Sequence, residues 1–222
     1  MLPHDAVGQW PPEVPPYRTP WTPAEPPAPT PAPPRTPGPM LPTWEEFEPP
    51  RQRDLADRLL DERIIVVSGD LDDQLANRTI SQLLVLGRSR NPIELHLTCE
   101  RSQLAAALTL ADAIDVVRSP VRAVVRGVLR GPAIAVLCAC ERRVAHHNAL
   151  FILSLPSTGI SAGSAQEVVH LSQQLELQEE QLRNRIAAVT GRTDEQVAHD
   201  LGTGRFLTAI EAKEYGLVEE IV

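Results

Sequence analysis

Proline is concentrated at one end of this chain, and its distribution limits where a compact fold can form. Of the 22 prolines, 18 lie in residues 1–50, which leaves four for the remaining 172 residues. Proline lacks a backbone N–H and breaks helices and central strands. A proline-rich segment such as residues 26–34 buries too little apolar surface to offset a chain entropy of about 1–2 kcal/mol per residue. We therefore predict a disordered tail with polyproline II character over residues 1–50 and one folded domain over residues 51–222.

In the predicted domain, apolar strands alternate with amphipathic helices. Four runs are expected as strands, the first of them fully buried: residues 64–67, 93–97, 121–125 and 150–155. Helical spacing of leucines predicts helices between them, over residues 72–86 and 103–117, with Ser102 capping the second. Two capping boxes, Thr193 with Gln196 and Thr208 with Glu211, predict two short helices near the end. This order favours right-handed crossovers and an α/β fold with a mostly parallel sheet.

The stretch from Arg126 to Leu137 combines a strand, a glycine turn and an apolar helix. The helix is predicted to begin at Pro132, because proline is favoured at the first helical position. A strand–turn–helix of this kind can present a nucleophile at the N-terminus of a buried helix. Here Gly131 offers no side chain, and Pro132 offers no backbone N–H.

One long helix is expected over residues 164–190, beginning at a capping box of Ser164 and Glu167 and ending at Gly191. Its apolar residues fall at spacings of three, four and seven: Val168, Leu171, Leu175, Leu182 and Ile186. Such a helix would extend about 37 Å, more than a small domain needs to cover its own sheet. We expect it to project and to form an oligomer contact through these residues. An ordinary core helix is the alternative.

Charge and hydropathy restrict the function further. The net charge of −8 argues against general nucleic-acid binding. No run of about 18 apolar residues is present, so no membrane span is expected. The first residues lack the basic and apolar regions of a secretory signal, and three cysteines are an odd number. Reduced thiols in a cytoplasmic setting are therefore expected.

A zinc site is the metal hypothesis that the sequence raises. Cys138 and Cys140, followed by His146 and His147, have the residue types of zinc ligands. The two sulfurs, however, lie two residues apart on a predicted helix and point to different faces. We expect these cysteines to be small core residues, and we expect neither a metal nor a cofactor.

Three stretches resemble the proteolytic subunit of the Clp protease, the ClpP family of serine peptidases. They are residues 58–65, residues 72–77 and, most specifically, residues 206–218. The resemblance runs from about residue 54 to residue 222. It implies a ClpP/crotonase-like superhelix of ββα units in which residues 164–190 form the projecting "handle" helix. It also implies stacked seven-membered rings, a cytoplasmic setting and an AAA+ unfoldase partner that uses the ATP.

The family's acyl transfer depends on a Ser-His-Asp triad, and the matching positions here hold none of the three. The serine motif Gly-x-Ala-Ala-Ser-Met matches residues 127–132, which puts Gly131 at the nucleophile position. The histidine motif Met-x-His-Gln-Pro matches residues 152–156, which puts Ser154 at the histidine position. The aspartate precedes a phenylalanine by two residues, which corresponds to Gly204.

The oxyanion hole of the family is expected to be lost as well. Its donors are backbone N–H groups from a Ser-Pro-Gly-Gly turn and from the residue after the nucleophile. The turn matches residues 99–102, with Ser102 at a degenerate oxyanion position, and Pro132 follows the nucleophile position with no N–H. Arg101 and Arg130 flank these positions, where they either fill the vacated cleft or remain solvated.

These departures predict a catalytically inactive ClpP-like subunit with a structural and regulatory role, in mixed rings with an active ClpP paralogue or with itself. Two alternatives stay open. One is a serine-type ATP-dependent endopeptidase with weak or re-sited activity, for which Ser154 with His146 or His147 is the conceivable pair. The other is a crotonase-fold protein that binds acyl-CoA, although that chemistry also needs paired backbone donors.

Overall fold

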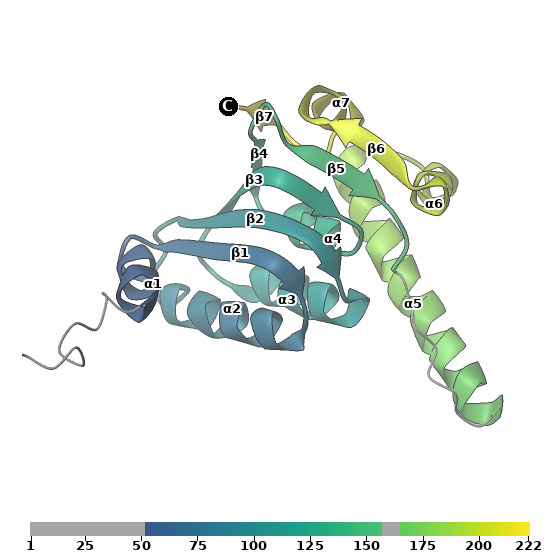
Figure 1. The fold of residues 1–222 in the computed structure, drawn as a ribbon, viewed down its shortest axis with the longest axis horizontal. Helices are drawn as coiled ribbons and strands as arrows, with labels where there is room; N and C mark the ends of the chain where they lie inside the picture. The colour runs from purple at the N-terminus through teal and green to yellow at the C-terminus, as the bar shows by residue number, and fades with distance from the viewer. Residues whose placement is uncertain (1–51, 157–164) are drawn as a thin grey trace, which may run out of the picture. The chain divides into compact units, whose positions relative to one another are not determined.

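The computed structural model describes residues 52–156 and 165–222, with side chains from Leu55 and Gln166 onward in these two ranges (Figure 1). The expected tail over residues 1–50 and Ser164 of the expected capping box lie outside the described residues. None of the described helices is long and apolar enough to cross a membrane.

The described part of the chain alternates helices and strands, as predicted. The elements are α1 (Gln52–Asp61), β1 (Ile64–Leu71), α2 (Asp73–Leu86), β2 (Ile93–Ser102), α3 (Leu104–Val116), β3 (Val121–Arg130), α4 (Ala133–Cys138), β4 (Arg142–Ala145), β5 (Leu150–Leu153), α5 (Ala165–Thr190), α6 (Asp194–Thr203), β6 (Arg205–Thr208), α7 (Ala209–Tyr215) and β7 (Glu220–Ile221).

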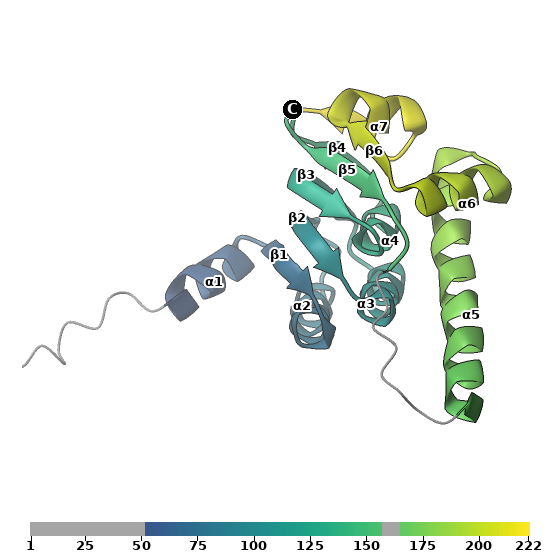
Figure 2. The same cartoon turned by 45° about the vertical axis from the view of Figure 1, so that its right-hand side comes forward.

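The strands form one mostly parallel sheet. Its main order is β1-β2-β3-β4-β7, and all of these pairs are parallel. β5 branches from β3 in parallel and pairs with β6 in antiparallel orientation. Helices α2, α3 and α4 lie on one side of the sheet (Figure 2), where the buried side chains of β1, β2 and β3 form the core with them. The predicted α/β class with a mostly parallel sheet is confirmed.

Two expectations about the strands were wrong. β1 is not fully buried: Ile65 and Val67 point into the core, but Val66 is 48% exposed, because the helices cover only one face of this edge strand. β3 does not end at a glycine turn. It continues to Arg130, and Gly127, with φ of 64°, lies where the β2–β3 register shifts. Glycine accepts a positive φ without strain, so here it forms an irregularity within the strand.

The long helix is present as α5, and its two halves have different surroundings. Leu182 and Ile186 are completely buried in the core of the same chain. Arg185 binds Asp112 and Asp115 of α3, which anchors this C-terminal half. The expectation that Leu182 and Ile186 form an oligomer contact is therefore corrected, because core packing already accounts for them.

The N-terminal half of α5 extends beyond the sheet in both views (Figures 1 and 2). Leu171 and Leu177 are 48% and 62% exposed there, and Val169 is exposed as well. Val168 and Leu175 are partly buried. The apolar surface of α5 that the described chain leaves uncovered therefore lies N-terminal to Leu182.

The C-terminal capping boxes form as predicted. In α6 the Thr193 hydroxyl accepts the Gln196 N–H while the Gln196 side chain accepts the Thr193 N–H, and Thr208 with Glu211 does the same in α7. The hydrogen bond from the Thr208 N–H is the main reason that the pKa of Glu211 is lowered. Gly216 ends α7 with φ of 94°, as the sequence suggested.

We predict that Gly216→Ala destabilises the fold by about 1–2 kcal/mol, because alanine is strained at positive φ. Its Cβ would also lie 3.1 Å from Cα of Thr190 at the end of α5. Gly202→Ala is the matched control. Gly202 lies within α6 with nothing near its Cβ position, so alanine should stabilise the helix by about 0.5–1 kcal/mol. Urea unfolding of both variants measures the difference in their free energy of unfolding. Equal unfolding midpoints would contradict the structural role given to Gly216.

Candidate functional site

Three strand ends and one helix start meet at the position where the sequence placed the lost triad. Gly131 follows the end of β3 and precedes α4. Ser102 is the last residue of β2, and Ser154 comes directly after β5. The parallel pairing of β3 with β2 and with β5 brings these ends to the same edge of the sheet.

Two of the three degenerate triad positions, Gly131 and Ser154, adjoin each other. A Cβ built on Gly131 would lie 3.3 Å from the Ser154 Oγ and 3.9 Å from the Ser102 Oγ. The antiparallel pairing of β5 with β6 ends at Leu153 and Arg205, and Gly204 lies directly before Arg205 at the C-terminal end of α6. The structure thus brings Gly131 and Ser154 together, although they are far apart in the sequence. Nothing in the described residues beyond its chain neighbours lies within 4 Å of a Cβ built on Gly204. The only side-chain functional group among the three positions is the Ser154 hydroxyl.

The Ser102 side chain caps the start of α4. Its hydroxyl accepts a hydrogen bond from the Ala133 N–H at 3.0 Å and donates one to the Arg130 carbonyl at 3.1 Å. This corrects the expected cap, since the N-cap of α3 is Gln103 and makes no side-chain cap bond. Sequence reasoning missed the role because Ser102 and Ala133 are 31 residues apart.

The backbone N–H groups of the β3–α4 turn are all engaged or missing. The Gly131 N–H donates to the Ile152 carbonyl at 2.9 Å, and the Ile134 N–H donates to the Gly131 carbonyl at 3.0 Å. Ser102 binds the Ala133 N–H, and Pro132 has no N–H. An oxyanion hole requires preorganised donors aimed at the developing charge. This turn offers no free N–H for that purpose.

A cavity of about 660 Å³ opens beside these residues. Five leucines contribute to its described walls: Leu71, Leu104, Leu155, Leu171 and Leu175. Its charged lining residues are Asp70, Asp72, Glu100, Arg101 and Arg130. The described lining contains no histidine, cysteine or lysine.

Two of the cavity carboxylates already have structural partners. Arg101 binds Asp70 through its Nε, 3.1 Å from both carboxylate oxygens, and through a terminal nitrogen at 2.7 Å. Asp70 and Arg101 lie opposite each other in β1 and β2, just beyond a shift in the register of these strands between Ser68 and Asp70. Asp72 caps α2 by accepting the Leu75 N–H at 2.8 Å. Neither carboxylate makes a hydrogen bond to Ser154.

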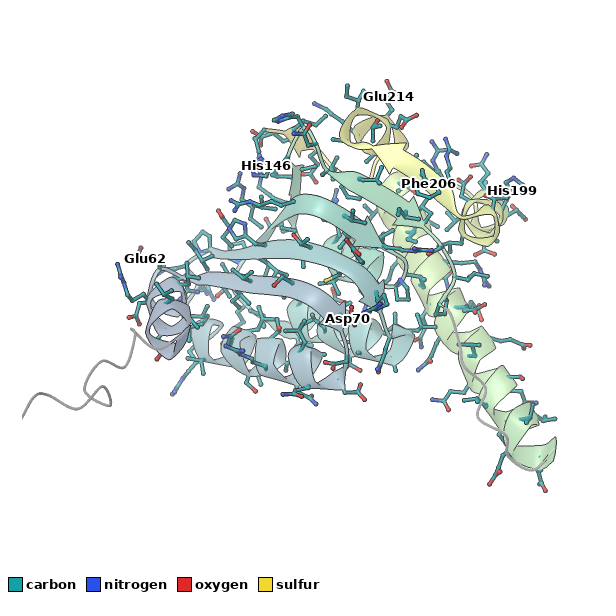
Figure 3. All side chains as sticks on the ribbon, in the orientation of Figure 1. Glu62, Asp70, His146, His199, Phe206 and Glu214 are labelled. Atoms are coloured by element: carbon teal, nitrogen blue, oxygen red, sulfur yellow. The ribbon has the colours of Figure 1, made fainter. Side chains whose placement is uncertain are left out.

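The histidines of the re-sited alternative do not line the cavity. The His146 Nε2 accepts a hydrogen bond from the Arg126 Nε at 3.2 Å, and the His147 N–H donates to the Val222 carbonyl. Figure 3 shows His146 well away from Asp70, which lines the cavity. The pair of Ser154 with either histidine is not assembled in this structure.

Cys99 and Cys140 are buried in the core, and the partly buried Cys138 packs against it. Cys140 is buried in the core, and its thiol contacts the Val136 carbonyl at 3.2 Å. Burial raises the pKa of Cys138 to about 12 and the pKa of Cys99 to about 11. Across residues 52–156 and 165–222, no three His, Cys, Asp or Glu residues are grouped closely enough to hold a metal ion.

A buried polar cluster that the sequence did not reveal holds the chain next to Gly204. Asp200 is only 7% exposed, and it accepts hydrogen bonds from the Tyr215 hydroxyl at 2.7 Å and from Arg205 at 3.1 Å. The Arg192 guanidinium lies 3.8 Å above the Tyr215 ring. Burial and the bond to Asp200 raise the pKa of Tyr215. The sequence did contain a signal for this buried carboxylate, since Asp200 lies between the core residues Val197 and Leu201 on α6.

The family model described as Clp protease matches residues 47–222. This chain belongs to the Clp protease family. The recognition drawn from the three sequence stretches is confirmed, and so is the fold that it implied.

Curated relatives in the Clp protease family cover most of the chain. It is 31% identical over 172 residues to the ATP-dependent Clp protease proteolytic subunit 3 of Rhodococcus jostii, which covers 76% of this chain and 85% of that one. It is 32% identical over 193 residues to the ATP-dependent Clp protease proteolytic subunit 2 of Thermobifida fusca, and the match covers 85% of this chain and 90% of that one. Among solved structures, a ClpP1 mutant from Listeria monocytogenes matches with a TM-score of 0.68 and 26% identity, over 76% of this chain and 95% of that chain.

We predict that Ser102→Ala lowers the free energy of unfolding by about 1 kcal/mol, as the loss of a helix cap typically does. The substitution leaves the Ala133 N–H without its acceptor. Ser154→Ala is the control, because the Ser154 hydroxyl makes no hydrogen bond within the described residues. Chemical denaturation measures both variants. A Ser102→Ala midpoint equal to that of Ser154→Ala would rule out the capping role.

Proposed function

We propose that this chain is a ClpP-like subunit without peptidase activity of its own, with a structural and regulatory role in mixed rings with an active ClpP paralogue. The observation that carries the proposal is the β3–α4 turn. Gly131 stands where a nucleophile would be presented, and the N–H groups around it are bonded or absent. A peptide bond in the cavity would meet neither a nucleophile with a base nor an oxyanion hole.

The size of these losses supports inactivity. Removing one oxyanion donor lowers the rate about 10²–10³-fold. Loss of a whole triad lowers it on the order of 10⁶-fold, and the residual rate depends on the oxyanion hole. The triad is absent, because its positions hold Gly131, Ser154 and Gly204. The contribution of the oxyanion hole is absent as well, because Pro132 has no N–H and Ser102 binds the N–H of Ala133.

The assembly part of the proposal depends on α5. Val168, Leu171 and Leu175 remain as its contact residues, since Leu182 and Ile186 belong to the core. The family resemblance implies heptameric rings stacked through this helix, an AAA+ unfoldase that uses the ATP, and a cytoplasmic setting. Leu171 and Leu177 on α5 remain about half exposed or more in the described chain, so their apolarity is consistent with a contact surface.

No contact among the described residues supports either alternative function. Re-sited endopeptidase activity needs a base beside Ser154, and the described cavity lining contains no histidine. Binding of acyl-CoA in the crotonase manner needs a pair of free backbone donors, which the turn at Pro132 lacks.

We predict that the purified protein neither cleaves fluorogenic peptides nor reacts with a fluorophosphonate probe for activated serines. Gly131→Ser alone should also remain unlabelled, because no base or free N–H is present to activate the new hydroxyl. Gel fluorescence and peptide turnover measure both, with an active ClpP as the positive control. Turnover that Ser154→Ala abolishes would contradict the proposal and favour re-sited activity.

We predict that the protein enters a ring particle when it is co-expressed with an active ClpP paralogue, and that Leu171→Asp lowers the mass of the particle while leaving the subunit folded. A charge buried in an apolar contact is strongly unfavourable. Gln181→Asp, on an exposed position of the same helix, should leave the mass unchanged. Native mass spectrometry measures the mass, and circular dichroism checks the fold. Exclusion of the wild-type chain from every ring would refute this role.

A further inference from the structure

A second cavity, of about 350 Å³, lies between α6 and the start of β6. This α6 cavity shares no lining residue with the cavity beside Gly131. His199, which lines it, lies well away from Asp70 of the first cavity (Figure 3). A volume near the lower end of the roughly 300–1,000 Å³ of ligand pockets suits a small ligand. The lining residues are Arg192, Glu195, Gln196, His199, Asp200 and Arg205.

One of the two arginines of the α6 cavity already has a carboxylate partner. The Arg205 guanidinium donates to one oxygen of Asp200 at 3.1 Å, and the other oxygen accepts the Tyr215 hydroxyl at 2.7 Å. Asp200 is 7% exposed, so both of its oxygens are engaged inside the protein. The negative charge of Asp200 is therefore offset by Arg205 before a ligand binds.

Arg192 is the cation that lacks an acceptor. Its guanidinium lies 3.8 Å from the centre of the Tyr215 ring, and that of Arg205 lies 5.3 Å from the same centre, so two positive charges share one ring. The Arg192 Nε is buried and has no hydrogen-bond partner in the described part of the chain. A buried donor without an acceptor is unfavourable. An anion in the α6 cavity would supply the acceptor and reduce the repulsion between the two guanidinium groups.

The donors of the α6 cavity come from three parts of the chain. Arg192 lies in the connection between α5 and α6, Gln196 lies on α6, and Arg205 begins β6. The Gln196 side-chain oxygen accepts the Thr193 N–H at 3.4 Å, which leaves the amide nitrogen to donate to a ligand. A guanidinium binds phosphate through two parallel hydrogen bonds. Donors from several directions suit the tetrahedral oxygens of phosphate better than the two coplanar oxygens of a carboxylate.

We propose that the α6 cavity binds a phosphate group, either as free phosphate or on a nucleotide. The inference goes beyond the proposed function and does not depend on the absence of peptidase activity. A bound phosphate would join the connection before α6 to the first residue of β6. It would therefore stabilise the segment from Arg192 to Arg205, which includes Gly204.

The test is isothermal titration calorimetry of the full-length protein with inorganic phosphate at constant ionic strength. Saturable binding is expected, and Arg192→Gln should weaken it about tenfold or more, because a charge-assisted, bidentate contact is lost. Glu195→Gln should instead strengthen binding about twofold or more, since it removes a negative charge from the lining. Arg90→Gln, at an exposed arginine outside the α6 cavity, is the control for the loss of a positive charge.

Opposite effects of Arg192→Gln and Glu195→Gln, with no effect of Arg90→Gln, support the inference. No saturable binding of phosphate, or equal binding by all variants, overturns it and leaves the proposed inactivity standing. Acetate that binds as tightly as phosphate would refute the selection for phosphate. Titration with adenosine monophosphate distinguishes the two sources, because tighter binding than that of free phosphate indicates a nucleotide. Urea unfolding without phosphate checks that Arg192→Gln is folded, and Glu195→Gln tests the site at an exposed residue.

Discussion

The hydroxyl of Ser102 joins three elements whose relative positions define the site. It accepts the first N–H of α4 and donates to the last carbonyl of β3, while its own backbone ends β2. An unsatisfied N–H at a partly buried helix start is unfavourable, so a side-chain acceptor stabilises this junction. The same two bonds make the junction unsuited to catalysis. The N–H that α4 could direct at a developing charge is already bound, and the residue before it is proline.

The site therefore differs from an active one by more than missing side chains. Gly131 takes a left-handed conformation, which glycine adopts without strain, at the point where a strand-to-helix turn would present a nucleophile. Around it, Arg101 is paired with Asp70, and Asp72 caps α2. The cavity persists because the strand ends and α5 that form its walls also build the core. The proposed inactivity and the retained shape of the cavity are compatible, since they depend on different atoms.

Much of the fold followed from local patterns. Capping boxes at Thr193 and Thr208 and the long α5 were predicted from short-range spacing, and the structure confirms them. What failed depended on partners distant in sequence. The exposed face of β1 follows from its edge position, and the role of Ser102 follows from a contact to Ala133 across two strands. The three triad positions were found only through the family resemblance, because no spacing along the chain links them.

Helix α5 has a C-terminal half anchored in the core and an N-terminal half that the described chain leaves uncovered, so substitutions in the two halves have different consequences. Substitutions near Ile186 disturb the packing of the core, whereas those near Leu171 alter a surface that the described chain leaves uncovered. The exposed residues of this helix can therefore change with little effect on thermodynamic stability, because they are not part of the core.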